Sequence, residues 1–163
     1  MKKYILAVVV QNNAGVLARI SSLFGRRGYN IESLTVSPTT NPEISRITII
    51  VTGDEYILEQ IIKQVSKLQE TIRIEHLQEE KALCEELVFV KVEATDPAMA
   101  DSIREVTEIY GGKIADELEG ILIVKLADTP SRIDAFLNVI SNFNVIETSR
   151  TGVTAVSRGR VNA

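Results

Sequence analysis

A stretch near the N-terminus reads Ile5-Leu6-Ala7-Val8-Val9-Val10-Gln11-Asn12-Asn13-Ala14-Gly15-Val16-Leu17. Its first six residues are all apolar, which predicts a strand that is covered on both faces. The polar residues that follow predict a loop, and Leu17, Ile20 and Leu23 then recur at the spacing of one helical face. The stretch therefore predicts a buried strand, a polar loop and an amphipathic helix in that order.

The residues that follow predict the rest of one folding unit. Strands are expected at 29–36 and 45–51, a helix over 57–68 with Asp54 as its cap, and a short strand from 72 to 74. The element order is then βαββαβ. This order is typical of a ferredoxin-like α+β unit, in which a four-stranded antiparallel sheet carries both helices on one face.

A weak internal repeat predicts a second unit of the same kind. Five positions between Leu17 and Ile31 match apolar or glycine positions 83 residues later, and three between Ile47 and Val51 match positions 75 residues later. The charged residues between the two copies lack periodicity, as a linker does. We therefore expect a first domain over 1–77, a linker over 78–86 and a second ferredoxin-like domain over 87–163.

The size of each unit predicts a homodimer. A unit of roughly 75 residues buries only about 60% of the surface of its unfolded chain and is marginal alone. One face of each sheet has no helix to cover it, although the strand at 5–10 is apolar on both sides. A second copy of the chain is expected to cover the bare face or edge.

Composition excludes several classes of function. The chain has 163 residues, of which 45% are hydrophobic, and a net charge of −4, so it has no electrostatic reason to bind nucleic acid or an anionic membrane. No apolar run approaches the roughly 20 residues of a membrane span. The run at 5–10 is followed by polar Gln11 rather than by a cleavage site, which favours a strand over a signal peptide. A cytoplasmic protein is expected.

No catalytic or metal site is predicted. His76 and Cys84 are the only residues of their kinds, and a lone pair of this sort gives no credible nucleophile and base. His76 is interpreted as a surface residue, and the acidic residues of 78–86 as a solvated linker without the spacing of a calcium loop. The arginine-containing segment 149–163 predicts a tail that folds back on a partner or frays.

The loop after the first strand carries the strongest chemical signal. A helix N-terminus offers free backbone N–H groups and a positive dipole end to an anion, and Gly15 allows a close approach. The side-chain carbonyls of Asn12 and Asn13 offer acceptors to an ammonium group. The surroundings expected for a ligand side chain are apolar: Val10, Val16, Leu17 and Ile31. A small apolar amino acid fits this combination best.

Structural explanations compete with this one. Asn13 and Gly15 are also favoured as a helix cap and a turn residue. In the second unit, however, the same place has Thr95-Asp96-Pro97-Ala98, a plain cap with proline at the first helical position. The helix start can thus be built without the asparagines and the glycine, which favours function for the first loop. Asn30 is either a ligand contact supplied by a neighbouring subunit or a turn residue.

Two nucleic-acid motifs are disfavoured by their context. Gly25-Arg26-Arg27-Gly28 has the GXXG form of a KH module, but here it ends a helix before a strand, so helix termination is preferred. The βαββαβ order is also that of an RRM. The expected inner strands, 5–10 and 47–51, carry no aromatic residue on which a base could stack.

Three parts of the chain together resemble a known family. They read Asn12-Asn13-Ala14-Gly15-Val16-Leu17-Ala18-Arg19, then Leu23-Phe24-Gly25-Arg26-Arg27-Gly28-Tyr29-Asn30-Ile31-Glu32-Ser33-Leu34-Thr35-Val36, then Ser149-Arg150-Thr151-Gly152 with Ser157-Arg158-Gly159. They closely resemble the small regulatory subunits of acetolactate synthase, also called acetohydroxyacid synthase. The resemblance runs from Lys3 to about Gly159. The loop alone indicates only an ACT domain, an amino-acid-sensing module.

The resemblance implies a regulatory, non-catalytic chain in branched-chain amino acid biosynthesis. Its first domain would be an ACT domain that binds valine at a dimer interface, and its large partner would hold thiamine diphosphate, magnesium and FAD. The chain would activate that partner and confer feedback inhibition. The family's effector residues fall on Asn12, Asn13, Gly15, Val16 and Leu17, with Asn30 and Ile31 from the facing subunit. Ala18 replaces the serine of some relatives.

One alternative stays open at this point. A stand-alone ACT-type sensor would act on another enzyme or on transcription. A basic surface or a helix-turn-helix segment would favour the transcriptional version, and neither is visible in the sequence. Which of valine, leucine and isoleucine is preferred is likewise left open.

Overall fold

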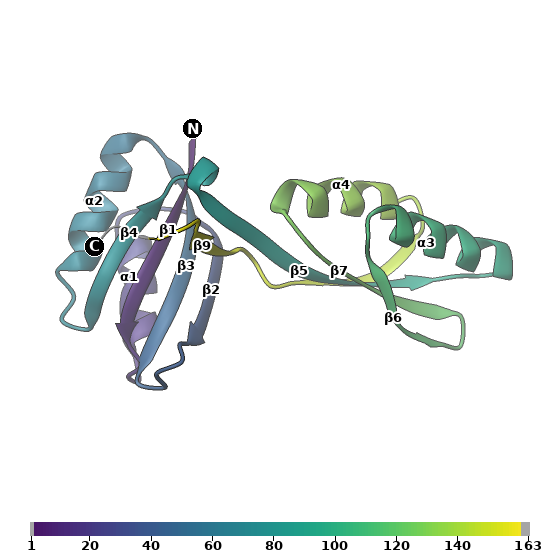
Figure 1. Cartoon of the computed structure of the whole chain (residues 1–163), viewed down its shortest axis with the longest axis horizontal. Helices are drawn as coiled ribbons and strands as arrows, with labels where there is room; N and C mark the ends of the chain where they lie inside the picture. Colours follow the sequence, from purple (N-terminus) through teal and green to yellow (C-terminus); the bar gives the residue numbers. More distant parts are fainter. Residues whose placement is uncertain (1, 161–163) are drawn as a thin grey trace. The chain divides into compact units, whose positions relative to one another are not determined.

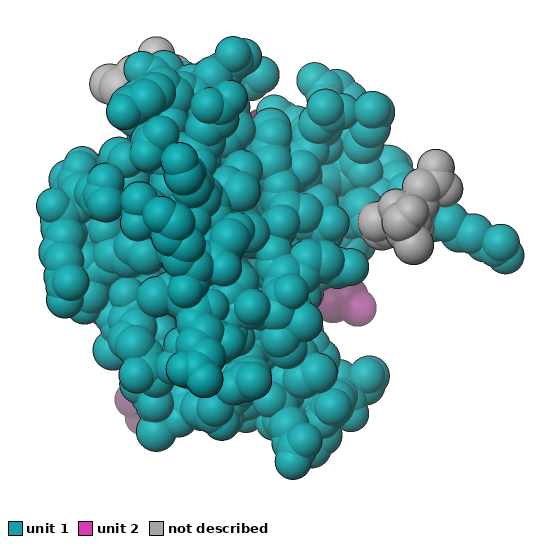
Figure 2. Space-filling view, turned by 90° about the vertical axis from the view of Figure 1, so that its left-hand side faces the viewer, with its two compact units in different colours: residues 1–84, 153–163 teal, residues 85–152 magenta. Residues whose placement is uncertain are grey.

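A computed structural model of the protein describes residues 2–160. Among the described residues, the chain forms two compact units, one of residues 2–84 with 153–160 and one of residues 85–152 (Figure 2). Each contains a four-stranded antiparallel arrangement with two helices, as predicted. Within 2–160, no helix combines the length and apolar character that a membrane crossing needs.

The first unit has the predicted βαββαβ order (Figure 1). Its elements are β1 (Lys2–Gln11), α1 (Val16–Arg26), β2 (Ile31–Pro38), β3 (Ile44–Gly53), α2 (Glu55–Ser66) and β4 (Thr71–Leu77). The strands lie in the order β2-β3-β1-β4, and all neighbouring strands are antiparallel. β1 and β3 are therefore the inner strands, and β2 and β4 are the edges.

The ends of the two helices follow the predicted local signals. The Asp54 carboxylate accepts a hydrogen bond of 2.8 Å from the Ile57 backbone N–H and so caps α2. α1 ends before Gly28, which adopts a φ of +68° that a residue with a side chain rarely takes. The N–H of Tyr29 then bonds back to the carbonyl of Phe24. The GXXG sequence is thus a helix terminus.

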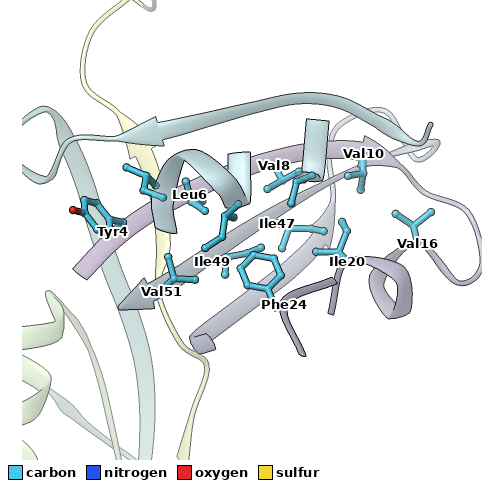
Figure 3. Packing of buried hydrophobic residues seen from close by; sticks show 13 residues of the cluster. Tyr4, Leu6, Val8, Val10, Val16, Ile20, Phe24, Ile47, Ile49 and Val51 are labelled. Atoms are coloured by element: carbon cyan, nitrogen blue, oxygen red, sulfur yellow. The ribbon is translucent and has the colours of Figure 1, made fainter. Parts of the chain in front are cut away.

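One face of the first sheet packs against both helices. Alternate residues of β1 and β3 meet the apolar side of α1 in a core that excludes water (Figure 3). The labelled members are Tyr4, Leu6, Val8, Val10, Val16, Ile20, Phe24, Ile47, Ile49 and Val51. Burying each large aliphatic or aromatic side chain contributes about 1.5–3 kcal/mol, so this face supplies most of the unit's stability.

The opposite face of the first sheet is partly covered by the chain itself. Ile5 and Ala7 of β1 and Ile50 of β3 form a second buried cluster with Leu77, Ala82, Val153 and Ala155. The all-apolar run at 5–10 is thus correctly predicted to be covered on both sides. At Ile5 and Ala7, however, the cover comes from the chain's own C-terminal segment rather than from a second copy.

The C-terminal segment, residues 153–160, contains an ordered strand, while residues 161–163 of the predicted tail lie outside the described residues. β9 (Thr154–Ser157) pairs with β5 (Ala82–Glu93), and the N–H of Arg158 bonds to the carbonyl of Lys81 at 2.7 Å. The sequence assigns residues 153–160 to the second domain, whereas in the structure they pack with the first unit. The apolar contacts of Val153 and Ala155 are the physical reason.

The second unit repeats the plan of the first. After the 3-10 turn η1 (Glu79–Lys81), its elements are β5, α3 (Pro97–Ile109), β6 (Lys113–Leu118), β7 (Ile121–Asp128), α4 (Pro130–Ile140) and β8 (Asn144–Arg150). Its strands lie in the order β6-β7-β5-β8. As predicted, Asp96 caps α3 and Pro97 occupies the first turn. β5 starts at Ala82, inside the segment that the sequence predicts to be linker.

Glu86 is buried, which contradicts the prediction that the acidic residues of 78–86 form a solvated linker. Its side chain is only 5% exposed and forms an ion pair with Arg150, which also bonds to Asp134 at 2.8 Å. The cation lies 64 residues further along the chain, so no local pattern distinguishes Glu86 from its exposed acidic neighbours. The pair joins the beginning and the end of the second unit.

Replacing Arg150 by methionine should destabilise the chain. The variant leaves the Glu86 carboxylate buried without its cation, and we expect a loss of about 2 kcal/mol in the free energy of unfolding. Arg132→Met, which removes an exposed pair with Asp128, should cost less than about 1 kcal/mol. Urea unfolding measures both. Equal losses in the two variants would contradict a special role for the buried pair.

Candidate functional site

The loop between β1 and α1 is anchored at its start. The Gln11 N–H bonds to the Glu70 carbonyl at 2.9 Å, and the Asn12 N–H to the Glu43 carbonyl at 2.7 Å. The Asn12 side-chain amide also donates to the Pro42 carbonyl at 2.9 Å. The sequence does not single out Pro42 and Glu43, because both act through backbone carbonyls, which every residue type offers. The anchors fix the direction in which the loop enters α1.

The start of α1 is open. Gly15 is its N-cap with a φ of +84°, no side chain caps the helix, and its first turn contains no acidic residue. A Cβ added to Gly15 would meet nothing within 4 Å. By contrast, α2 and α3 are each capped by an aspartate carboxylate. The Val16 N–H bonds to the Asn13 carbonyl, so the Leu17 and Ala18 N–H groups and the positive dipole end are what this helix start offers to an anion.

Asn13 does not cap the helix through its side chain. Its amide N–H donates to the Gln11 side-chain oxygen at 3.1 Å, and its backbone carbonyl accepts from the Val16 N–H at 3.3 Å. The competing explanation, in which Asn13 is present as a side-chain cap, is therefore wrong. Asn12 and Asn13 are both exposed beside the open helix start. Each donates through its amide nitrogen, which leaves a carbonyl oxygen as an acceptor.

The apolar surroundings of the loop differ from the prediction. The side chains of Val10 and Val16 point into the core of the first unit and are buried, so they cannot line an open ligand site. Leu17, the next residue of α1, is 39% exposed. The first helical turn therefore presents the side chain of Leu17 and only the backbone of Val16.

Asn30 and Ile31 lie at the other end of the same sheet. Ile31 pairs with Val51, which pairs with Tyr4 near the start of β1, whereas the loop follows Gln11 at its end. Seven residues of strand separate these positions, a distance of about 24 Å. Within one copy of the chain, the structure brings Asn12, Asn13, Gly15 and Leu17 together and leaves Asn30 and Ile31 apart.

His76 and Cys84 form no catalytic pair in the described part of the chain. His76 lies within β4, half-buried, with its ring edge-on to Tyr4 at 5.4 Å between centroids, so its interpretation as a surface residue is wrong. Burial lowers the pKa of His76 and raises the pKa of the Cys84 thiol. Residues 2–160 contain no group of three or more acidic, histidine or cysteine side chains placed to hold a metal ion.

A hollow lies on the face of the second sheet that no helix covers. It has a volume of about 390 Å³, and its lining includes Phe89, Ile123, Lys91 and Glu147. The Lys91 ammonium lies 2.7 Å from the Glu147 carboxylate, and this hydrogen bond lowers the pKa of Glu147. The Lys91 and Glu147 charges satisfy each other, and the exposed side chains of Asp116 and Ser149 also line the hollow. The loop at the start of α1 is the better candidate.

Two protein families match the two halves of the chain. The family described as "AHAS small subunit-like ACT domain" matches residues 6–73. The family described as "Small subunit of acetolactate synthase" matches residues 85–159. The first match contains the loop and Ile31, and the second contains the whole second unit together with residues 153–159.

Relatives match over nearly the whole chain. The acetolactate synthase isozyme 3 small subunit of Escherichia coli is 42% identical and covers 95% of both chains. A probable acetolactate synthase small subunit of Methanothermobacter thermautotrophicus is 41% identical over 96% of this chain and 93% of its own. The crystal structure of the acetolactate synthase small subunit of Thermotoga maritima superposes with a TM-score of 0.91 at 32% identity, covering 99% of this chain and 100% of that one.

Replacing Gly15 or Gly25 by alanine should change the free energy of unfolding in opposite directions. Gly15→Ala forces a side chain into the left-handed region and should lower the free energy of unfolding by about 1 kcal/mol. Gly25 lies inside α1 with nothing within 4 Å of an added Cβ, so Gly25→Ala should raise it by about 0.5–1 kcal/mol. Urea unfolding followed by circular dichroism measures both. A neutral Gly15→Ala variant would contradict the left-handed helix start.

Proposed function

The chain belongs to the family of small regulatory subunits of acetolactate synthase, and from this premise we propose that it senses valine at the loop between β1 and α1. It is a non-catalytic subunit whose partner is the catalytic large subunit. Its first unit is an ACT domain of branched-chain amino acid biosynthesis. Under this proposal, valine is the effector, the loop between β1 and α1 is half of its site, and a second copy of the chain completes the site.

The observation that carries the proposal is the open start of α1. The valine carboxylate accepts hydrogen bonds from the first-turn N–H groups of Leu17 and Ala18, where no side-chain cap or acidic residue of the first turn competes. The carbonyl oxygen of Asn12 or Asn13 accepts from the ammonium group. The isopropyl group lies against Leu17. A ligand with both charges and a small apolar side chain matches the open helix start, the asparagine carbonyls and the exposed side chain of Leu17.

The second half of the site comes from a facing subunit. β2 is an edge strand, and its end at Pro38 lies across the sheet from Val10, at the same end as the loop. If two copies pair their β2 edges antiparallel about a two-fold axis, the start of one β2 lies beside the end of the other. Asn30 and Ile31 of the partner then reach the loop that they cannot reach within their own chain.

A site split between subunits gives valine a way to regulate. The ligand stabilises the packing in which both halves meet, provided that it binds this packing better than any other. Couplings of this kind are typically about 1–3 kcal/mol, which changes activity or affinity from fivefold to over a hundredfold. The same dimer both activates the large subunit and makes it sensitive to valine.

The large subunit supplies the chemistry under this proposal. Thiamine diphosphate, magnesium and FAD are held there, and the small subunit contributes no ligand to them. A cytoplasmic location is part of the same proposal, and Cys84, a free thiol, agrees with a reducing compartment. Valine is placed ahead of leucine and isoleucine as the effector.

Gly15→Asp should abolish valine inhibition of the reconstituted holoenzyme. The variant places a carboxylate where the valine carboxylate binds, and it should weaken valine binding at least about tenfold. Gly15→Asn is the matched control, because it has the same size and a similar tolerance of positive φ but no charge. Calorimetric titration with valine, leucine and isoleucine measures binding. Unchanged valine inhibition in Gly15→Asp would contradict the site.

Mixing two defective subunits tests whether the site is shared. Gly15→Asp damages the loop half and Asn30→Ala the facing half, so homodimers of either variant should not respond to valine. In a random mixture half of the dimers are mixed, and each has one intact site, so about a quarter of the sites should recover. Valine titration of the mixture measures this. No recovery, with subunit exchange verified, would place both residues in one protomer's site.

A further inference from the structure

A hydrogen bond joins the C-terminal segment to the strand that begins beside Asn30. The backbone N–H of Val153 donates to the Ser33 hydroxyl oxygen at 2.8 Å in a partly buried setting. The two residues are 120 positions apart in the sequence. Ser33 lies on β2, three residues beyond Asn30. The bond therefore connects the C-terminal segment to the part of β2 that the proposed effector contacts.

The C-terminal segment is firmly seated on the first sheet. The Arg46 guanidinium on β3 donates to the Ala155 carbonyl at 2.9 Å. Val153 and Ala155 are both buried against Ile5, Ala7 and neighbouring apolar residues. A displacement of β2 near Ser33 should therefore shift the C-terminal segment, because its buried contacts keep it on the sheet.

The same segment leads directly into the second unit. Thr151 still belongs to that unit, where its N–H bonds to the Leu87 carbonyl at 3.0 Å and its hydroxyl oxygen accepts from the Leu87 N–H at 3.1 Å. Gly152, with a φ of +87°, follows, and Val153 already belongs to the first unit. The Ser33 bond thus lies at the residue where the chain passes between units.

The start of β2 is irregular and is set apart from the rest of the strand by a bulge. The register with β3 shifts between Ile31 and Ser33, so that Glu32 is an extra residue in the strand. The Glu32 carboxylate is held by Lys3 at 2.6 Å and by the Thr52 hydroxyl, and the Lys3 hydrogen bond lowers its pKa. The regular pairing with β3 begins at Ser33, opposite Ile50, so a shift of Asn30 and Ile31 would reach the regular part of the strand at Ser33.

We propose that Ser33 is a positioning residue that transmits the effector signal to the second unit. When valine binds Asn30 and Ile31, the start of β2 takes a new position. The hydrogen bond from Val153 to Ser33 then moves Val153, and the chain transmits this movement through Gly152 to the second unit. The inference rests on the proposed function, because it takes the effector to contact the beginning of β2. Valine binds one of the two positions of β2 better than the other and so selects it.

Ser33→Ala removes the acceptor and should separate valine binding from valine response. Ser37→Ala is the matched control, because Ser37 lies on the same face of β2 by strand alternation and is exposed. Ser33→Thr restores a hydroxyl. Each variant is purified as the full chain, checked by circular dichroism, titrated with valine by calorimetry, and combined with the large subunit for inhibition assays. Hydrogen exchange of residues 85–152 is measured with and without valine.

We expect Ser33→Ala to bind valine within about threefold of the wild type, while its inhibition by valine weakens about fivefold, as loss of one hydrogen bond predicts. The valine-dependent change in exchange over 85–152 should also disappear. Ser37→Ala and Ser33→Thr should behave like the wild type. Wild-type inhibition and exchange in Ser33→Ala would overturn the inference, and so would equal losses of binding and inhibition. Absence of valine binding by the wild type would overturn the proposed function and this inference together.

Discussion

The rest of the structure depends on keeping both faces of β1 away from water. Six consecutive apolar residues give this strand no polar side to expose, and it also pairs with a neighbour on each edge. The two helices cover one face. The other face requires a segment from elsewhere, and Val153 and Ala155 supply it at Ile5 and Ala7. The chain therefore returns to its first unit after building the second.

The candidate site begins where this buried strand ends. Two helices of the chain begin with an aspartate cap that contributes about 1 kcal/mol each, yet α1 begins with an uncapped glycine. Because Gly15 has no side chain to cap α1, the helix is less stable there, and backbone N–H groups stay exposed to a ligand. A rigid strand on one side and a helix on the other hold these groups in place, as a binding site requires. Local departures of this kind are typical of functional positions.

Much of the candidate site was predictable because it is contiguous in the sequence. Asn12, Asn13, Gly15 and Leu17 follow one strand and precede one helix, so locating these elements located the residues. The direction of individual side chains was less predictable. Val16 was expected beside the ligand, but it is the first buried residue of α1, and helical periodicity does not define a face until a full turn has formed. Ile31 and Asn30 lie one strand length away, which only the register with β3 reveals.

By itself, the sequence determined the features that neighbouring residues control. These are the two βαββαβ units, the helix caps at Asp54 and Asp96, the end of α1 at Gly28 and the position of the loop between β1 and α1. Only the tertiary structure decided that Glu86 is buried with Arg150 and that the C-terminal segment covers the first sheet. The reason is physical: local signals arise from hydrogen bonds and periodicity within a few residues. These two contacts join positions 64 and 120 residues apart: the first forms only when the second unit has folded, and the second only when the chain has returned to the first unit.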